Sequence, residues 1–340
     1  MSEQYLVTSS DLTSVADAIR AKTGGTEQLS FPEGFNTAIT GISTETSTEP
    51  YVEYTLDEAG NMTEASLHGF TTIPAYMFQN TTTLAAVDLT NSPNLTNIGE
   101  GVFSGCTNLT LISLPDGITN IAKYAFRNCT NLALTSLPSS LTSIGDVAFS
   151  GCTNLDLASL PSGVTSIGQY AFQSCKKLAL TSLSDGLINI ESHAFRGCDN
   201  LALTSLPDGL TSIKYATFYN CGNLAITSLP SSLTKVGYVA FFCCTSLTNI
   251  EIAAQTLGDD EGCIVFKGCT GLQKVWLRST CTSISTPTVS SAPFMNCSES
   301  LEIYAEPAEK PAGWGDYFNR TGADGGTTVT VVYGQTTCPW

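Results

Sequence analysis

Histidine is almost absent from this chain, and its scarcity excludes several kinds of catalytic and metal site. There are two histidines, His68 and His193, far apart in the sequence. A Ser/His/Asp triad or a Cys/His pair needs a histidine beside the nucleophile. Zinc sites combine histidine and cysteine ligands at short spacings, and the thirteen cysteines include no C-x-x-C pair. We therefore expect no catalytic residue, no metal site and no bound cofactor.

Basic residues are also scarce, which limits the classes of partner. The chain has 14 lysines and arginines against 30 aspartates and glutamates, a formal net charge of -16. A surface of this charge repels nucleic acid and anionic membranes. No stretch approaches the ~20 apolar residues of a membrane span, and the start has no basic segment followed by an apolar run. We expect no nucleic acid partner, no membrane insertion and no signal peptide in this chain.

Sequence motifs of enzymes are missing as well. Glycine-rich phosphate loops are absent. The acidic run Asp259-Asp260-Glu261 offers oxygen ligands, but its spacing matches no EF-hand loop. We interpret this run as a solvated loop, and we expect that the protein is not an enzyme.

A strict repeat dominates the middle of the chain. Phenylalanines recur every 23 residues, each followed three residues later by a cysteine. The phenylalanines are Phe103, Phe126, Phe149, Phe172, Phe195, Phe218 and Phe241, and the cysteines are Cys106, Cys129, Cys152, Cys175, Cys198, Cys221 and Cys244. A fixed period of this size indicates one supersecondary unit stacked on copies of itself. The repeat therefore predicts a solenoid.

One copy of the repeat shows how each turn is expected to fold. The alternation of Leu132 and Leu134 predicts a short strand with one buried face. Pro138 ends this strand. Residues 141–144 are typical of a second short extended segment, and Phe149 of an inward anchor on the return. The fold class predicted is mainly β, with short strands and turns.

The Leu-Pro step and the Ala-Phe-x-x-Cys signature of this unit closely resemble the BspA-like class of leucine-rich repeat. The resemblance covers residues 67–304, with a degenerate copy ending at Phe78 and two longer copies, of 25 and 28 residues, ending at Phe266 and Phe294. Ser184 replaces the proline in one copy. The resemblance implies a leucine-rich repeat solenoid that serves for binding and, in many members, a place at the cell surface.

The cysteines are best explained by packing. Those in register with the phenylalanines occupy one position in successive repeats, where the same small volume is required each time, and cysteine is among the most buried residue types. We predict reduced core thiols there. Cys243, Cys263, Cys281 and Cys338 fall outside the register and are better candidates for exposure or pairing, so their redox state stays open.

The N-terminal residues do not follow the repeat. Leu12, Val15, Ala16 and Ile19 have the spacing of an amphipathic helix, which predicts a small helical N-terminal module over residues 1–43. The segments 11–25 and 29–34 resemble a short module that opens many tail-associated proteins of phages and prophages. That resemblance implies docking or homo-oligomerisation through residues 1–43, whereas a simple N-terminal cap is the other interpretation.

The domain organisation follows from these boundaries. We expect a helical module over 1–43, a linker over 44–50, a β-hairpin cap over 51–66, the repeat solenoid over 67–304, and a C-terminal aromatic cap over 305–340. Trp314, Tyr317 and Phe318 are predicted to seal the last repeat. An aromatic patch for carbohydrate is the alternative for these three side chains.

Variation between copies is concentrated just before the Ala-Phe step. Positions needed only for folding converge on one solution, whereas a recognition surface diversifies, and tyrosine offers a large contact area at low entropic cost. We predict a contact strip there, which consists of Lys123, Tyr124, Gln169, Tyr170, His193, Tyr215, Tyr219 and Tyr238. That these positions are merely exposed and unconstrained is the alternative.

These features together favour a non-enzymatic binding or adhesion protein that presents an extended repeat surface to a protein or glycan receptor. The alternative is a structural or receptor-binding protein associated with a phage or prophage tail. The first function places the chain at the cell surface or outside the cell, and the second on a virion. The sequence does not name the ligand, the oligomeric state or the curvature.

Overall fold

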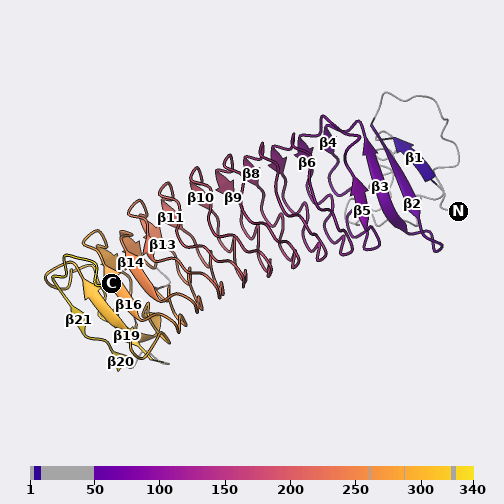
Figure 1. Cartoon of the computed structure of the whole chain (residues 1–340). Coiled ribbons are helices and arrows are strands. Elements are labelled where there is room, and N and C mark those ends of the chain that lie inside the picture. The colour runs from indigo at the N-terminus through magenta and orange to yellow at the C-terminus, as the bar shows by residue number, and fades with distance from the viewer. Residues whose placement is uncertain (1–3, 9–49, 260–261, 287, 323–326) are drawn as a thin grey trace, which may run out of the picture. The chain divides into compact units, whose positions relative to one another are not determined.

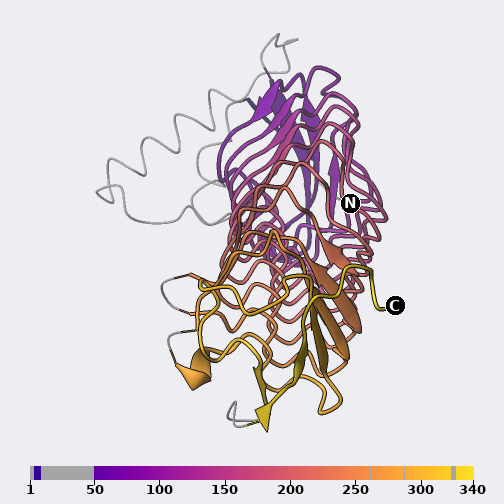
Figure 2. The same cartoon turned by 90° about the vertical axis from the view of Figure 1, so that its left-hand side faces the viewer.

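A computed structural model describes residues 4–8, 50–259, 262–286, 288–322 and 327–340. The chain divides into two compact units, Met1–Leu155 and Asp156–Trp340. Both consist of turns of a β-solenoid, about 10 turns in all, and within each unit successive turns lie side by side (Figures 1 and 2). In the part of the chain that the structure describes, the only helical segment is a 3-10 turn, η1 (Val289–Ser291).

The first unit begins with a four-stranded sheet in the order β1-β2-β3-β5. Its strands are β1 (Gln4–Thr8), β2 (Tyr51–Leu56), β3 (Met62–His68) and β5 (Ala86–Asp88). β2 pairs antiparallel with β1 and with β3, and β3 pairs parallel with β5. The turn between β2 and β3 is closed by Asp57, whose Oδ1 accepts the amides of Ala59 and Asn61.

The predicted helix of the N-terminal module lies outside the described residues, as do the segments that resemble a phage tail module. Residues 4–8 of that module are described, and they form the strand β1 rather than a helix. In register with β2, this strand extends the sheet at the start of the solenoid.

Each further turn contributes a two-residue strand that pairs in parallel with that of the next turn. In the first unit these strands are β4 (Thr72–Ile73), β6 (Asn97–Ile98), β7 (Asn120–Ile121) and β8 (Ser143–Ile144). The isoleucine is buried, and the polar residue before it faces outward. The alternation of Ser or Asn with Ile thus defines this strand, as the sequence of residues 141–144 predicts.

The second unit contains two parallel sheets besides the pair β9 (Ser166–Ile167) and β10 (Asn189–Ile190). One sheet consists of β11 (Ser212–Ile213), β13 (Lys235–Val236), β15 (Thr256–Leu257) and β17 (Ser283–Ile284). The other consists of β12 (Ser228–Leu229), β14 (Asn249–Ile252), β16 (Lys274–Leu277), β18 (Glu302–Ala305) and β21 (Val331–Val332). A separate antiparallel pair joins β19 (Arg320–Thr321) and β20 (Thr327–Thr328).

The repeated phenylalanines form the centre of the core. In the first unit, the rings of Phe78, Phe103, Phe126 and Phe149 stack with centroids 5.6, 5.3 and 5.4 Å apart. In the second unit, the stack runs through Phe172, Phe195, Phe218, Phe241, Phe266 and Phe294. All are fully buried. The copies of 25 and 28 residues therefore keep the inward anchor, and their extra residues lie elsewhere in the turn.

The cysteine three residues after each phenylalanine is buried and hydrogen-bonded. Its thiol donates to the phenylalanine carbonyl of the preceding turn, as from Cys129 to Phe103 and from Cys152 to Phe126, at 2.9 Å each. All thirteen cysteines are thiols that form no disulfide. Cys263 and Cys281, two of the candidates for exposure or pairing, are fully buried in the lengthened turns. Of the four cysteines outside the register, Cys338 is exposed and Cys243 half-buried.

The predicted first strand of the regular repeats is wrong in its secondary structure, although its leucines are buried. Leu132, Leu134 and Leu137 all point inward, but residues 131–137 form no strand. Two outward residues, Thr135 and Ser136, separate Leu134 from Leu137, and this break in alternation prevents a regular ladder. In contrast, β14 and β18 alternate between buried and more exposed residues, and both pair with β16 to form a sheet.

The C-terminal aromatic side chains close the second unit. Trp314 and Phe318 are buried with ring centroids 4.9 Å apart, and the Trp314 indole N–H donates to the carbonyl of Cys281 at 2.8 Å. Tyr317 is half-buried. The faces of Trp314 and Phe318 are therefore not available to a sugar, whereas Tyr317 remains partly exposed.

Candidate binding surface

The contact strip lies on the turn that leads into each core phenylalanine. Two residues of this turn have a left-handed backbone, for example Tyr124 (φ 60°) and Asn128 (φ 58°). This geometry lets alternate amides point to the next turn of the solenoid. In one turn, the amides of Tyr124, Phe126 and Asn128 donate to the carbonyls of Asp146, Ala148 and Ser150 at 3.0, 2.8 and 2.7 Å.

The first of these left-handed positions carries the variable side chains. Its occupants in the two units are Tyr76, Gly101, Tyr124, Val147, Tyr170, His193, Ala216 and Val239, all with φ between 51° and 62°. Glycine is the residue that tolerates this conformation best, and a bulky side chain there costs about 1–2 kcal/mol. Gly101 shows that the turn accepts glycine. Aromatic rings at the same position are thus not explained by the backbone.

In the first unit, the structure brings Lys123 and Tyr124 of the contact strip together. The Lys123 ammonium lies 4.8 Å from the centroid of the Tyr124 ring, and the Arg127 guanidinium lies 5.9 Å from it. Two positive charges thus lie within cation–π distance of the Tyr124 ring. Tyr76, which the contact strip did not include, donates its hydroxyl to Glu100. This hydrogen bond, followed by burial, raises the pKa of Tyr76 to about 12.

In the second unit, four members of the contact strip form a continuous row of rings. Tyr170 stacks on His193 with centroids 4.4 Å apart, and His193 meets the edge of Tyr215 at 5.0 Å. Tyr215 in turn stacks on Tyr238 at 6.1 Å. Burial, and then the nearby Arg196, lower the pKa of His193, so its ring is neutral at physiological pH.

Tyr219 and Tyr238 also have a packing role. Both lie against a small apolar cluster outside the main core, formed by Ala216, Val239, Ile264, Ala292 and Met295. Tyr219 stacks on Phe242 with centroids 4.7 Å apart. The guanidinium of Arg196 lies 5.0 Å from the centroid of the Tyr219 ring. Gln169 and Tyr215 are exposed, whereas Tyr170 and His193 are half-buried. In the second unit, Tyr170, His193 and Tyr215 are therefore the aromatic members that remain available to a partner.

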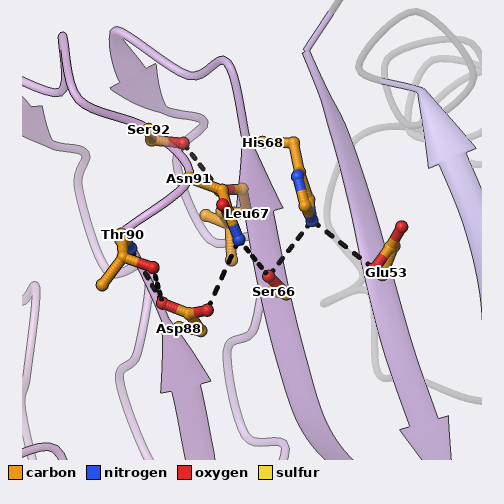
Figure 3. A network of polar contacts seen from close by, with 8 residues as sticks. All are labelled: Glu53, Ser66, Leu67, His68, Asp88, Thr90, Asn91 and Ser92. Carbon is orange, nitrogen blue, oxygen red and sulfur yellow. Dashed lines mark hydrogen bonds and ion pairs between the residues drawn. The ribbon is translucent and has the colours of Figure 1, made fainter. Parts of the chain in front are cut away.

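The other histidine lies in a polar network on the outer face of the first unit's sheet (Figure 3). Ser66 Oγ is 3.1 Å and Glu53 Oε2 is 3.5 Å from the same atom, Nε2 of His68. The ring also stacks on Tyr51 at 4.4 Å. A catalytic triad places the hydroxyl and the carboxylate on different ring nitrogens. This network thus lacks the geometry of a serine hydrolase.

Asp88 and Asn91 complete that network. The side-chain amide of Asn91 donates to Ser66 Oγ at 3.3 Å and to Asp88 Oδ2 at 3.4 Å (Figure 3). Glu53, Ser66 and Asp88 are direct partners across β2, β3 and β5. Hydrogen bonds from Thr90 lower the pKa of Asp88. The arrangement is a cross-strand polar ladder that stabilises this sheet and gives it a hydrophilic face.

The His, Cys, Asp and Glu side chains of the described ranges form no group of three or more that could hold a metal ion. No helix within these ranges is long and apolar enough to cross a membrane.

The sequence-based prediction missed the outer face of β14, β16 and β18. On the regular turns the side chain at the position of Glu251 is small, as at Ser228, which pairs with Glu251 in the parallel register. The last turns instead present Glu251, Trp276 and Tyr304 in one row across the strands. The signal was present in the sequence, since small residues give way to large polar and aromatic ones after residue 248.

Comparison with known proteins places the chain in a family. The family model of the BspA type leucine-rich repeat region matches six copies, over residues 71–202 and 165–302, which is more than half of the chain. No curated protein matches it.

Several solved structures are similar. A leucine-rich cell surface protein from Faecalibacterium prausnitzii is 22% identical, with 84% of this chain and 93% of that chain covered and a TM-score of 0.44. A Treponema (T. pallidum) leucine-rich repeat protein is 27% identical over 50% of this chain and 86% of its own, at a TM-score of 0.39. The pneumococcal vaccine antigen PcpA is 16% identical over 83% of each chain, at 0.47. On the family model's match, this chain belongs to the BspA type leucine-rich repeat family.

Proposed function

We propose that this protein is a non-enzymatic binding protein whose contact strip takes a protein partner. The observation that supports this most is the presence of Tyr124, Tyr170 and His193 at left-handed positions. Glycine would fold there at lower cost, as Gly101 does. Non-glycine residues held in such conformations are concentrated at functional sites, where the side chain is needed for another reason.

The ring geometry supports a protein rather than a glycan at the contact strip. Sugars stack on free aromatic faces, but here neighbouring rings or cations cover the faces, as Tyr170 covers His193 and Lys123 covers Tyr124. The rings present their edges and polar groups instead. Tyrosine and arginine presented in this way are typical of contact residues in protein–protein interfaces.

A substitution series tests this proposal. The double variant Tyr170→Gly/Tyr215→Ser removes two members of the contact strip, and glycine relieves the positive φ at position 170. Ile188→Ser is the matched control, since Ile188 is an exposed apolar residue outside the contact strip. We expect the labelled double variant to lose binding to the cells or purified proteins that bind the wild type, with an unchanged melting temperature. Equal binding by the double variant would contradict the proposal.

The setting of this function is also a proposal. A family used for surface recognition supports a location at the cell surface or outside the cell. The alternative of a tail-associated protein, and homo-oligomerisation through residues 1–43, depend on residues 9–43, which lie outside the described residues. They stay predictions.

A further inference from the structure

Charged and aromatic side chains cover the outer face of β14, β16 and β18. Lys274, Trp276 and Arg278 follow one another at alternate positions of β16 and just beyond it, so they share one face. The pairing of the strands sets Trp276 between Glu251 on β14 and Tyr304 on β18. We call this arrangement the grid; Trp276 lies at its centre, and its other members are Glu251, Lys274, Arg278, Glu302, Tyr304 and Glu306. β14 and β16 are seen near the C-terminal end of the second unit in Figure 1.

Charged groups fix the guanidinium of the grid. Arg278 Nη1 donates to Glu251 Oε1 at 2.6 Å, and Arg278 Nε donates to Glu306 Oε2 at 3.1 Å. The guanidinium also lies 4.5 Å from the centroid of the Trp276 ring. The same Glu306 oxygen accepts the amide of Ser279 at 2.7 Å. Arg278 is thus held in one position before any ligand arrives.

The central tryptophan has an unused hydrogen-bond donor. Trp276 is 4% exposed, and its indole Nε1 is buried without a partner among the described residues. A buried donor that is left unsatisfied costs about 1–3 kcal/mol. An acceptor supplied by a ligand removes this cost, which makes the indole N–H a specific anchor.

The side chain two residues before Trp276, on the same face of β16, is loosely held. Lys274 and Glu302 are partners across β16 and β18, but their charged atoms are 3.9 Å apart and their side chains are 34% and 54% exposed. Such an exposed pair contributes little to stability. Tyr304 donates its hydroxyl to Glu302 Oε2 at 2.8 Å. The Lys274 side chain can therefore move away from Glu302 at little cost, while the hydrogen bond between Tyr304 and Glu302 stays in place.

The size of the grid limits what can bind. Three parallel strands and five residues along each span about 10 by 13 Å, whereas a stable protein interface needs ~800 Å² from each partner. The same face of the regular turns offers a small side chain, as at Ser228. A ligand of one or two sugar rings fits this area, and a protein does not.

The chemistry of the grid selects a saccharide. Carboxylates and a guanidinium form paired hydrogen bonds in one plane, which match neighbouring hydroxyl groups, and Tyr304 offers a half-exposed ring. Three carboxylates, Glu251, Glu302 and Glu306, outnumber the two cations, so an anionic sugar is disfavoured. We propose that the grid binds a neutral saccharide of one or two units, whose hydroxyl oxygen accepts the Trp276 N–H and whose other hydroxyls donate to Glu302.

Titration of the full chain with methyl glycosides of glucose, galactose, mannose and N-acetylglucosamine tests the proposal. Tryptophan emission and saturation-transfer NMR report binding at millimolar concentration. We expect at least one glycoside to bind and Trp276→Phe, which keeps an aromatic ring but removes the N–H, to weaken it about tenfold or more, the effect of one lost hydrogen bond. Trp340→Phe, at a tryptophan outside the grid, is the control and is expected to bind normally.

A second variant keeps the test valid if Trp276→Phe disturbs the fold. The side chain of Glu302 is more than half exposed, so Glu302→Gln leaves the sheet intact and is expected to weaken binding as well. Absence of binding by all four glycosides, or full binding by both variants, would overturn the proposal. Variants of the contact strip are expected to bind the glycoside normally, which separates this site from the proposed protein-binding function.

Discussion

The side-chain amide oxygen of Asn128 lies in the space that a Cβ of Gly151 would occupy. Both residues hold the second left-handed position of their turns, with φ of 58° and 78°. Nearer the N-terminus, the side-chain oxygen of Asn80 likewise lies where a Cβ of Gly105 would be. Glycine in one turn thus makes room for asparagine in its neighbour, and this complementarity helps to fix which turns stack.

Gly151→Ala is therefore expected to destabilise the protein by about 2–4 kcal/mol. The positive φ accounts for about 1–2 kcal/mol, and displacement of Asn128 for the rest. Gly60→Ala is the matched control, because Gly60 has φ +83° but open space around its Cβ position. Denaturant unfolding should show a clearly larger loss for Gly151→Ala, with partial rescue by Asn128→Gly. Equal losses for the two alanine variants would refute the pairing.

Thr81→Val is expected to stabilise the protein by about 1–2 kcal/mol. Thr81 occupies the cysteine position after Phe78, is buried, and its Oγ1 has no hydrogen-bond partner among the described residues. In later turns the thiol donates to the phenylalanine carbonyl of the turn before, as Cys106 does to Phe78. Valine has nearly the same shape and removes an unsatisfied hydroxyl.

Thr83→Val is the matched control, with a stability change of opposite sign, and calorimetry measures the unfolding of both variants. Its hydroxyl donates to the carbonyl of Met62 at 2.7 Å, so its loss is expected to destabilise by about 0.5–1.5 kcal/mol. Two changes of the same sign would show that the hydroxyl of Thr81 does not explain its effect.

Stability should fall steeply at alkaline pH because of the buried thiols. Burial raises the pKa of Cys106 and of Cys281 to about 12. Burial also raises the pKa of Cys198, Cys221 and Cys269 well above the usual range of a thiol. Thiols of the unfolded chain ionise near pH ~8.5. The folded state therefore keeps protons that the unfolded state loses, so stability is complete below pH ~8.5 and declines by about 1.4 kcal/mol per pH unit for each thiol above it.

A pH titration under reducing conditions checks this expectation. Ultraviolet absorbance of the thiolate and circular dichroism of the backbone should change together, since ionisation accompanies unfolding. Thiolate absorbance from the core cysteines in a chain that is still folded would contradict the prediction.

Alkylation of the native protein should separate the cysteines by burial. Cys338 is exposed and should react within the first minutes, whereas Cys243 is half-buried, with its pKa raised by burial, and should react slowly. The remaining thiols should react only after unfolding. Mass spectrometry of the labelled peptides provides the measurement, and fast labelling of Cys263 or Cys281 would be inconsistent with their burial.

Much of the fold could be predicted from the sequence because the 23-residue period places a side chain of the same volume at the same core position in each turn. Phe126 and Cys129 recur wherever the core needs one ring and one thiol, and the structure confirms the solenoid. The lack of a strand at residues 132–134 was not predictable in this way, since burial of both leucines is compatible with a strand or with an irregular extended chain. The three-residue step from Leu134 to Leu137 decided the outcome.

The contact strip and the grid differ in how far the sequence reveals them. Variation before the Ala-Phe step marked Tyr170 and Tyr215, but not that Tyr238 packs on an apolar cluster, because that contact joins different positions of successive turns. The grid depends on the parallel register of β16 with β18, which sets Trp276 beside Tyr304. Copies of unequal length hide that register in the sequence.

Site-specific photocrosslinking tests most directly the central claim that the contact strip binds a protein. A photoreactive phenylalanine analogue replaces either Tyr215, which is 40% exposed, or Ile188, which is 51% exposed and lies outside the contact strip. The full-length variants are incubated with the cells or purified proteins that bind the wild type and are then irradiated. We predict a discrete protein adduct from position 215 that is absent from position 188. No adduct at position 215, or the same adducts from both positions, would contradict the account.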